Sequence, residues 1–158
     1  MLDSARYIVR ESVRNMPRVE VKEDKSPVTA IDRAVELALR TCVREDFPQD
    51  GVFGEEGGYE PGRELADGNQ GGRWNWIIDP IDGTKSLITG KPLFGTLVAL
   101  VEEEHGEVVL GGVEMPVLGE RWIGARGAQT EFERESASGE ERAQVETRRC
   151  PRLEDAYL

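Results

Sequence analysis

The chain has 158 residues, enough for one domain with a hydrophobic core and too few for two comfortable ones. Its net charge of −11 argues against binding to a nucleic-acid polymer, which depends on Lys and Arg neutralising phosphates. No stretch approaches the roughly 20 apolar residues of a membrane span, and the N-terminus lacks the basic-then-apolar form of a secretory signal. We therefore expect a cytoplasmic protein that does not bind a membrane.

Two amphipathic helices are predicted in the first third of the chain. The first has Ala5, Ile8, Val9 and Val13 at helical spacing and ends near Asn15. A short extended piece over 19–22 and a polar turn over 23–27 follow.

The second helix is predicted to begin after Thr29. Thr29 and Asp32 resemble a capping box, and the helix ends before Pro48. Its apolar face is expected to comprise Ile31, Ala34, Val35, Ala38 and Val43.

Strands dominate the rest of the prediction. Apolar or alternating runs favour strands at 51–54, 74–78, 96–101, 108–113 and 121–124. Residues 57–73 and the charged stretch 135–142 are predicted as loops, and 144–147 could add an edge strand. Two helices followed by mostly antiparallel strands predict a layered α+β fold.

Three polar residues outside the motifs have simple expected roles. Cys42 and Cys150 form neither a CxxC pair nor a disulfide framework, so both are predicted to be free thiols that serve as packing residues. His105, the single histidine, lies in a predicted hairpin turn, where we expect it to be exposed and outside the chemistry.

Acidic residues follow two of the predicted strands, where rigid scaffolds often present functional groups. Glu55 comes after the strand at 51–54, and Asp79 and Asp82 come after the strand at 74–78. Pro80 favours a tight turn that could aim both aspartates and the Ile81 carbonyl at one point. Oxygen ligands of this kind suit a hard cation such as Mg²⁺.

The next two residues add groups suited to a phosphate. Gly83 and Thr84 offer bare backbone N–H groups and a hydroxyl. If a helix begins there, its first turn would bind a phosphate.

Each piece also has a simpler explanation. The segment from Asp79 to Thr84 could be an Asx-turn in which the aspartates cap backbone groups. Glu55 and Glu56 could form a solvated face, and Asp32 could serve only as a capping carboxylate. The joint arrangement of the pieces favours a functional site.

Three motifs together resemble the inositol monophosphatase superfamily of Mg²⁺-dependent, lithium-sensitive phosphatases. They are KSPVTAID at 25–32, GEE at 54–56 and WIIDPIDGT at 76–84, in the order that the family has them. The resemblance implies the layered α/β sandwich of inositol monophosphatases and sugar phosphatases. It also implies that residues 1–158 form the N-terminal metal- and phosphate-binding half of that fold, truncated before the C-terminal half.

The resemblance assigns a role to each motif residue. Glu55, Asp79 and the Ile81 carbonyl would hold a first metal ion, and Asp79 would bridge to a second ion that Asp82 also binds. Thr84, helped by Glu55 and by Asp32 behind it, would orient the attacking water. The backbone of Gly83 and Thr84 would contact the phosphate.

Further segments are closer to the histidinol-phosphatase type than to the inositol type. They are residues 84–90, 92–100 and 116–122, although their apolar members, such as Phe94 and Trp122, could equally be core residues. We therefore expect hydrolysis of histidinol phosphate, a step of histidine biosynthesis. An inositol phosphate, another sugar phosphate or a 3′-phosphonucleotide is the alternative substrate, and a homodimer is compatible with the family.

The sequence departs from the family at its end. Family members continue into a second half that carries one more metal-binding aspartate and most specificity residues, whereas this chain stops after Asp155, Ala156, Tyr157 and Leu158. Two or three Mg²⁺ ions are implied, with the second site lacking its C-terminal ligand. An inactive fragment that acts at most as an interaction module is the remaining alternative, with an uncovered apolar patch on the sheet.

Overall fold

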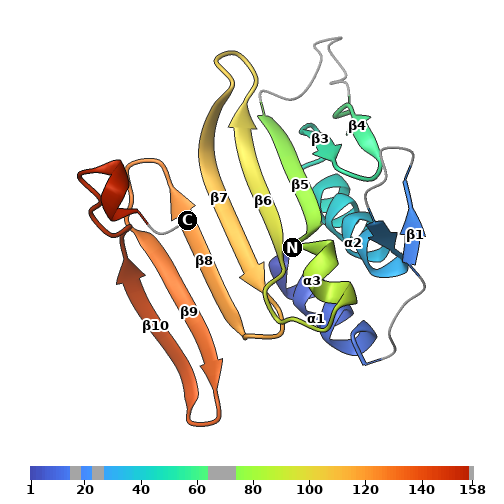
Figure 1. The fold of residues 1–158 in the computed structure, drawn as a ribbon. Coiled ribbons are helices and arrows are strands. Elements are labelled where there is room, and N and C mark those ends of the chain that lie inside the picture. Colours follow the sequence, from blue (N-terminus) through green and yellow to red (C-terminus); the bar gives the residue numbers. More distant parts are fainter. Residues whose placement is uncertain (15–18, 23–26, 64–73, 157–158) are drawn as a thin grey trace.

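The computed structural model describes residues 1–14, 19–22, 27–63 and 74–156. Its centre is an eight-stranded sheet in the order β10-β9-β8-β7-β6-β5-β3-β4 (Figure 1). Neighbouring strands are antiparallel except for β3 and β5, which are parallel. The strands are β3 (Gly51–Gly54), β4 (Gly58–Glu60), β5 (Trp74–Asp82), β6 (Gly95–Glu102), β7 (Glu107–Met115), β8 (Glu120–Ala125), β9 (Thr130–Ser136) and β10 (Gly139–Val145).

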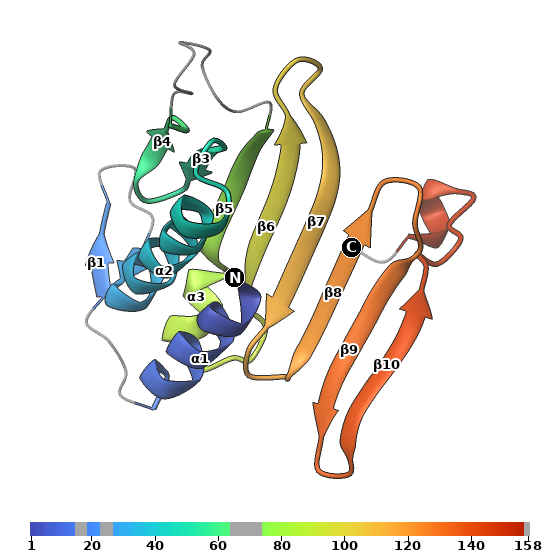
Figure 2. The same cartoon turned by 180° about the vertical axis from the view of Figure 1, so that it is seen from behind.

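Helices α1 (Leu2–Ser12) and α2 (Ala30–Asp46) lie together on one face of the sheet (Figure 2). The short helix α3 (Thr84–Ile88) follows β5 directly. A two-stranded sheet of β1 (Val19–Val21) and β2 (Pro27–Thr29) leads into α2, and the 3₁₀ helix η1 (Leu153–Asp155) lies near the chain end. This arrangement confirms the predicted α+β fold. In the part of the chain that the structure describes, no helix has the length and apolar character to cross a bilayer.

The core lies between the two helices and the covered face of the sheet. Helix α2 buries an apolar residue at every fourth position because that spacing stays close to one side of a helix. These residues are Ile31, Val35, Leu39 and Val43. Ala34 was expected on this face but is exposed, because it lies about 100° around the helix from Val35.

The predicted capping box is confirmed at the start of α2. Thr29 is the N-cap residue, and its side chain accepts a hydrogen bond from the amide of Ile31. Asp32 accepts in return from the Thr29 amide at 2.9 Å. The sequence thereby fixes both the start of α2 and the place of Asp32 in its first turn.

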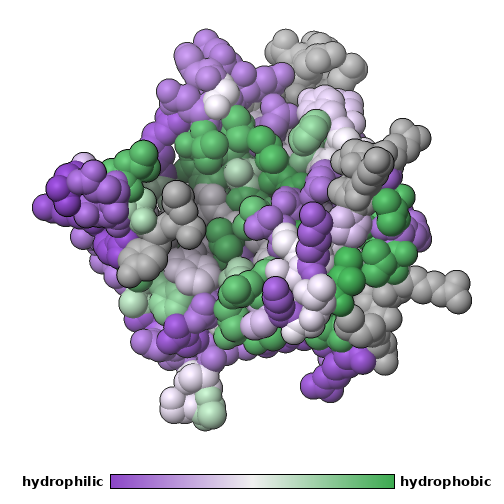
Figure 3. All heavy atoms as spheres, viewed as in Figure 1, coloured by the Kyte–Doolittle hydropathy of each residue, from purple (hydrophilic) through white to green (hydrophobic). Residues whose placement is uncertain are grey.

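The opposite face of the sheet carries apolar side chains, and neither α1 nor α2 covers it (Figure 1 and Figure 2). Register places Phe53, Ile77 and Ala99 side by side across β3, β5 and β6. Phe53 is 51% exposed and Ile77 43% exposed, and Figure 3 shows apolar side chains gathered over the middle of this face. The predicted strand at 74–78 is confirmed as part of β5, and its residues alternate between a covered and an open face.

The charged stretch 135–142 was predicted as a loop, but most of it belongs to the hairpin of β9 and β10. Ion pairs across this hairpin join Arg142 to Glu133 at 3.3 Å and Arg134 to Glu141 at 3.8 Å. These opposite charges replace the apolar alternation that usually marks a strand. The edge strand expected at 144–147 is β10, which begins earlier and ends at Val145.

Three smaller expectations differ from the structure. The predicted loop at 57–73 contains the short strand β4, and its residues 64–73 lie outside the described part. Cys150 is exposed and so is no packing residue, whereas Cys42 is half-buried; neither is in a disulfide. The polar turn at 23–27 lies outside the described residues up to Ser26, and with it the first two residues of the KSPVTAID motif.

Candidate active site

Glu55 and Asp79 become neighbours because β3 and β5 run parallel. Gly54 pairs in register with Ile78, and the amide of Glu55 donates to the Ile78 carbonyl at 3.1 Å. The residue that follows each of these partners is an acid. Two carboxylates from distant parts of the sequence therefore meet at one end of the sheet.

Asp79 is held in an environment that disfavours its charge. Burial, the nearby charge of Glu55 and then that of Asp82 raise the pKa of Asp79 from its usual 3.8 to about 7. A hydrogen bond from the Ile81 amide acts in the opposite direction. A carboxylate crowded by two others requires a compensating positive charge to ionise fully at neutral pH.

The two oxygens of Asp79 differ in their surroundings. The hydrogen bond from the Ile81 amide to the Asp79 carboxyl group is an Asx-turn contact. The alternative of an Asx-turn therefore accounts for part of the geometry of this segment. The other oxygen, Oδ1, is buried and has no hydrogen-bond partner among the described residues. Buried polar atoms are rarely left in that condition, and a missing ion is one recognised reason. Oδ1 is therefore suited to act as a ligand of a cation.

The segment from Asp79 to Asp82 forms the last part of β5, and the expectation of a free tight turn is wrong. Pairing with β6 is irregular here, because Asp79 opposes Leu97 and Asp82 opposes Gly95. Thr96 anchors the irregular segment by donating to the Pro80 carbonyl at 2.8 Å. Such a bulge changes the direction of side chains at the end of a strand.

Ile81 and Asp82 occupy different environments at this bulge. The Ile81 side chain is buried in the core, and its carbonyl accepts a hydrogen bond from the Thr84 hydroxyl at 3.0 Å. Asp82 is exposed at the end of the strand. The bulge thus fastens the backbone through Ile81 while it leaves the Asp82 carboxylate open to solvent.

Thr84 begins α3, and its hydroxyl lies 3.2 Å from Oδ1 of Asp32. Asp32 is buried, and its other oxygen accepts from the amide and hydroxyl of Thr29. Asp32 is therefore both a capping residue and the neighbour of Thr84.

Gly83 precedes α3 with a φ of +86°. Glycine adopts this left-handed conformation without steric penalty. A Cβ there would also lie 3.0 Å from the Leu93 carbonyl oxygen. The position between Asp82 and Thr84 therefore requires glycine.

The donor set consists of oxygen atoms only, which fits Mg²⁺ better than softer metals. The carboxylates of Glu55, Asp79 and Asp82 do not form a tight triad in the described residues. The carboxylate and imidazole atoms that do lie within 4.8 Å of one another belong to Glu102, Glu104 and His105, on the β6–β7 hairpin. His105 is exposed as predicted, and this second group lies on a solvated turn, where clustered acids are common.

Lys22 supplies positive charge beside the site. Its amine lies 3.2 Å from Glu55 and 2.5 Å from Glu56. Of the two glutamates, Glu55 is the more exposed, with 49% of its side chain accessible against 11% for Glu56. The alternative of a solvated glutamate pair therefore does not describe Glu56, whose side chain is largely buried.

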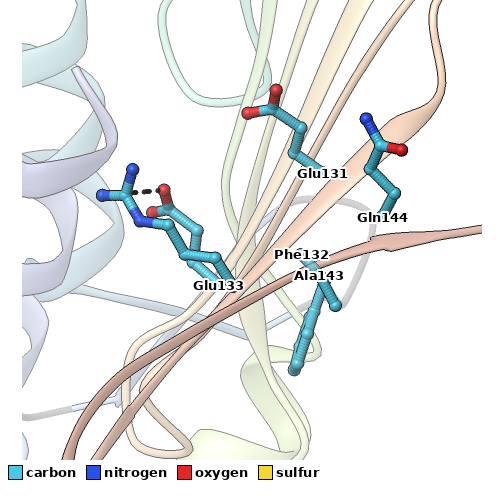
Figure 4. A pocket seen from close by; sticks show the side chains of 6 residues that line it. Glu131, Phe132, Glu133, Ala143 and Gln144 are labelled. Atoms are coloured by element: carbon cyan, nitrogen blue, oxygen red, sulfur yellow. Dashed lines mark ion pairs between the residues drawn. The ribbon is translucent and has the colours of Figure 1, made fainter.

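A pocket of about 260 Å³ lies away from these residues, between β9 and β10 (Figure 4). The ion pair of Arg142 and Glu133 forms one wall, and Phe132 and Ala143 also line the pocket. Strands β6, β7 and β8 separate it from β5 in the sheet. The acidic residues that the sequence singles out therefore lie outside this pocket.

Sequence reasoning missed one residue close to the site. Glu36, one helical turn after Asp32, is buried and accepts hydrogen bonds from the amides of Glu56 and Gly57. A signal for it exists in the sequence, because a charged residue interrupts the apolar face of α2 between Val35 and Leu39.

The sequence profile of the inositol monophosphatase family matches residues 2–158. The chain belongs to the inositol monophosphatase family. Among curated relatives, the chloroplastic bifunctional phosphatase IMPL2 of Arabidopsis thaliana is 39% identical over 158 residues, which cover 100% of this chain and 41% of that protein. The histidinol-phosphatase of Mycobacterium tuberculosis is 44% identical over 110 residues, covering 70% of this chain and 38% of that protein.

Solved structures support the same fold. The inositol monophosphatase of Zymomonas mobilis superposes with a TM-score of 0.66 and 39% identity, over 94% of this chain and 50% of that one. The family member described here thus spans about 40% of the length of the two curated relatives and half of the solved one. The predicted fold type is confirmed by these matches.

Proposed function

We propose that the chain carries the metal- and phosphate-binding site of a phosphatase that hydrolyses a small phosphate monoester. The observation that carries the proposal is the buried, unpartnered Oδ1 of Asp79, placed between the charges of Glu55 and Asp82. A site that concentrates negative charge in this way can receive a phosphorylated metabolite only when bound cations reverse the local field.

Glu55, Asp79 and the carbonyl of Ile81 would hold one Mg²⁺ ion, and Asp79 with Asp82 a second. When bound, such ions lower the pKa of the attacking water and neutralise charge on the phosphoryl group. The bridging role of Asp79 is supported by the charges of Glu55 and Asp82, which both act on its carboxyl group. The backbone of Gly83 and Thr84 is assigned to the phosphate by the family resemblance.

Thr84 and Asp32 orient the attacking water in this proposal. A threonine hydroxyl has one proton to donate, and here it faces two acceptors, Asp32 at 3.2 Å and the Ile81 carbonyl at 3.0 Å. With its proton directed to Asp32, the hydroxyl oxygen accepts a hydrogen bond from water. Because Thr29 holds the other oxygen of Asp32, this carboxylate cannot turn away.

Histidinol phosphate is the substrate we favour. The support is the 44% identity to a histidinol-phosphatase and the segments at 84–90, 92–100 and 116–122. An inositol phosphate is the second candidate, favoured by the 39% identity to an inositol monophosphatase. Another sugar phosphate or a 3′-phosphonucleotide is the third.

Phosphate release in the presence of Mg²⁺ tests the function. Histidinol phosphate, inositol 1-phosphate and a 3′-phosphonucleotide are assayed with the 158-residue chain and with the product of the complete reading frame of its gene. We expect the highest kcat/KM on histidinol phosphate. Equal or higher kcat/KM on another monoester would overturn the proposed substrate. Phosphate release by an Asp79→Asn variant at the rate of the unmodified protein would overturn the proposed metal site.

A further inference from the structure

Helix α2 carries a buried ion pair on the side that faces the active-site turn. Glu36 is 3% exposed and Arg40 is 7% exposed, and the two are joined at 2.9 Å one helical turn apart. They lie on the covered face of the helix among Val35, Leu39 and Val43. Charged side chains in such a place require partners for every hydrogen-bonding group.

Glu36 is hydrogen-bonded to the backbone of the turn that bears Glu55. The amide of Glu56 donates to Oε2 of Glu36 and the amide of Gly57 donates to Oε1, both at 2.8 Å. Arg40 donates to the carbonyl of Gly58 at 2.6 Å. The pair therefore holds three successive residues after Glu55 by charge-assisted hydrogen bonds.

Glycines on both sides of Glu55 show how closely the pair approaches the chain. A Cβ on Gly54 would lie 2.4 Å from the Glu36 carboxylate, and a Cβ on Gly57 would lie 2.7 Å from it. Both distances are shorter than any stable contact of a side-chain carbon. The sequence Gly54-Glu55-Glu56-Gly57 thus has glycine where the backbone meets Glu36.

The backbone of Glu55 is consequently fixed from two directions. Its own amide is bonded to Ile78 of β5, and the residues after it are bonded to α2. The side chain of Glu55, by contrast, is half exposed and lies 3.2 Å from the amine of Lys22. The backbone therefore limits where the Glu55 carboxylate can point, and its side-chain contacts are with Lys22 and the Asp79 carboxyl group.

We propose that Glu36 is a positioning residue for Glu55: through the amides of Glu56 and Gly57, it directs the Glu55 carboxylate toward Asp79. The inference rests on the proposed function, in which Glu55 is a metal ligand. A buried ion pair by itself is weak support for stability or function. What distinguishes this one is that both carboxylate oxygens of Glu36 accept from the turn that bears Glu55, while Arg40 binds the Gly58 carbonyl and Glu60.

The test uses Glu36→Gln in the 158-residue chain, with Mn²⁺ as the only added metal ion. A glutamine keeps the size of the side chain but presents an N–H₂ group to one of the two backbone amides. We expect amide hydrogen exchange at Glu56 and Gly57 to become several-fold faster, and Mn²⁺ affinity to fall about 10- to 100-fold. Titration by electron paramagnetic resonance measures free Mn²⁺.

Arg44→Gln is the matched control. Arg44 lies on the same helix and ties it to β4 through Glu60, without contact to the Glu55 turn. Its loss should leave Mn²⁺ affinity unchanged. A purely structural role of Glu36 would lower resistance to urea while the folded variant keeps the affinity of the unmodified protein, and that result would overturn the inference.

Gly57→Ala provides a second variant in case Glu36→Gln fails to fold. It displaces the turn from Glu36 while both charges remain, and Gly111→Ala, where a Cβ meets nothing within 4 Å, is its control. We expect weaker Mn²⁺ binding for Gly57→Ala alone, and unchanged binding overturns the inference. If the unmodified chain binds no Mn²⁺, the proposed function fails and the inference with it, a result distinct from equal binding by all variants.

Discussion

The hydroxyl of Thr84 lies 3.2 Å from Oδ1 of Asp32, although the two residues are 52 positions apart. Thr84 opens α3, and Asp32 is in the first turn of α2. The capping box that starts α2 therefore also supplies the acceptor for the proposed water-orienting hydroxyl. Helix formation and the active site depend on the same carboxylate.

Replacing Thr84 tests this relationship directly. Thr84→Val removes the hydroxyl at nearly constant volume, and we expect kcat to fall about 100-fold or more with KM little changed, because the hydroxyl acts on the attacking water. Thr84→Ser retains the hydroxyl and should keep most of the activity. Equal loss in both variants would show that the loss does not depend on the hydroxyl alone, and full activity of Thr84→Val would contradict the proposed role.

Thr29→Ala tests the contribution of the N-cap to the stability of α2. Loss of the N-cap side chain should lower the free energy of unfolding by about 1 kcal/mol, read from the urea midpoint at constant m. Thr41→Ala is the control, since Thr41 is exposed and donates within the helix to the Leu37 carbonyl. We expect the Thr41 variant to change stability by less than about 0.5 kcal/mol.

Asp79 should make the metal-free protein sensitive to pH. Because its pKa is raised to about 7 from 3.8, the folded state holds a proton that the unfolded state has lost, and stability falls as pH rises through that window. Partial exposure to solvent reduces the effect, and we expect a loss of roughly 2 kcal/mol from pH 5 to pH 8 in a chelator.

Asp79→Asn should remove this slope and stabilise the metal-free chain at pH 8. Urea unfolding at pH 5 and pH 8 in the presence of a chelator measures it, with Asp46→Asn, an exposed position at the end of α2, as control. The same substitution should abolish Mn²⁺ binding. A variant that is less stable than the unmodified protein at pH 8 would contradict the claim that Glu55 and Asp82 disfavour the charge of Asp79.

Glu114 provides a test of the ion pairs that connect α1 to the sheet. It is fully buried and accepts from Arg6 at 2.5 Å and from Arg121 at 2.7 Å. Glu114→Gln removes the buried counter-charge that Arg6 and Arg121 share and leaves them Glu135 and Asp3, which are more exposed, so we expect a loss of about 3 kcal/mol in unfolding free energy. Arg126→Gln breaks an exposed pair with Glu107 and should cause no measurable change.

Much of the site could be predicted from sequence, because its residues lie in short motifs with strong local rules. The Thr29–Asp32 box and the glycine before Thr84 follow from capping and backbone conformation alone. The hairpin of β9 and β10 could not be predicted in this way. Its strands are joined by ion pairs such as Arg142 with Glu133, and apolar periodicity gives no indication of them.

Glu36 was missed for a different reason. Its function depends on two backbone amides 20 and 21 positions away, at Glu56 and Gly57, and no local pattern encodes that distance. The open apolar face was expected as a patch, but which residues form it depends on register. That register places Phe53 beside Ile77 and was visible only in the structure.

The parallel pairing of β3 with β5 has a consequence for how the gene can vary. Parallel neighbours cannot be joined by a tight hairpin, so β4 and the residues between it and β5 form a long connection. Insertions in that connection cost little, since closure entropy grows slowly with length. A single inserted residue within β3 or β5 would instead move Glu55 or Asp79 to the other face of the sheet. The number of residues can therefore vary between the two motifs but not within them.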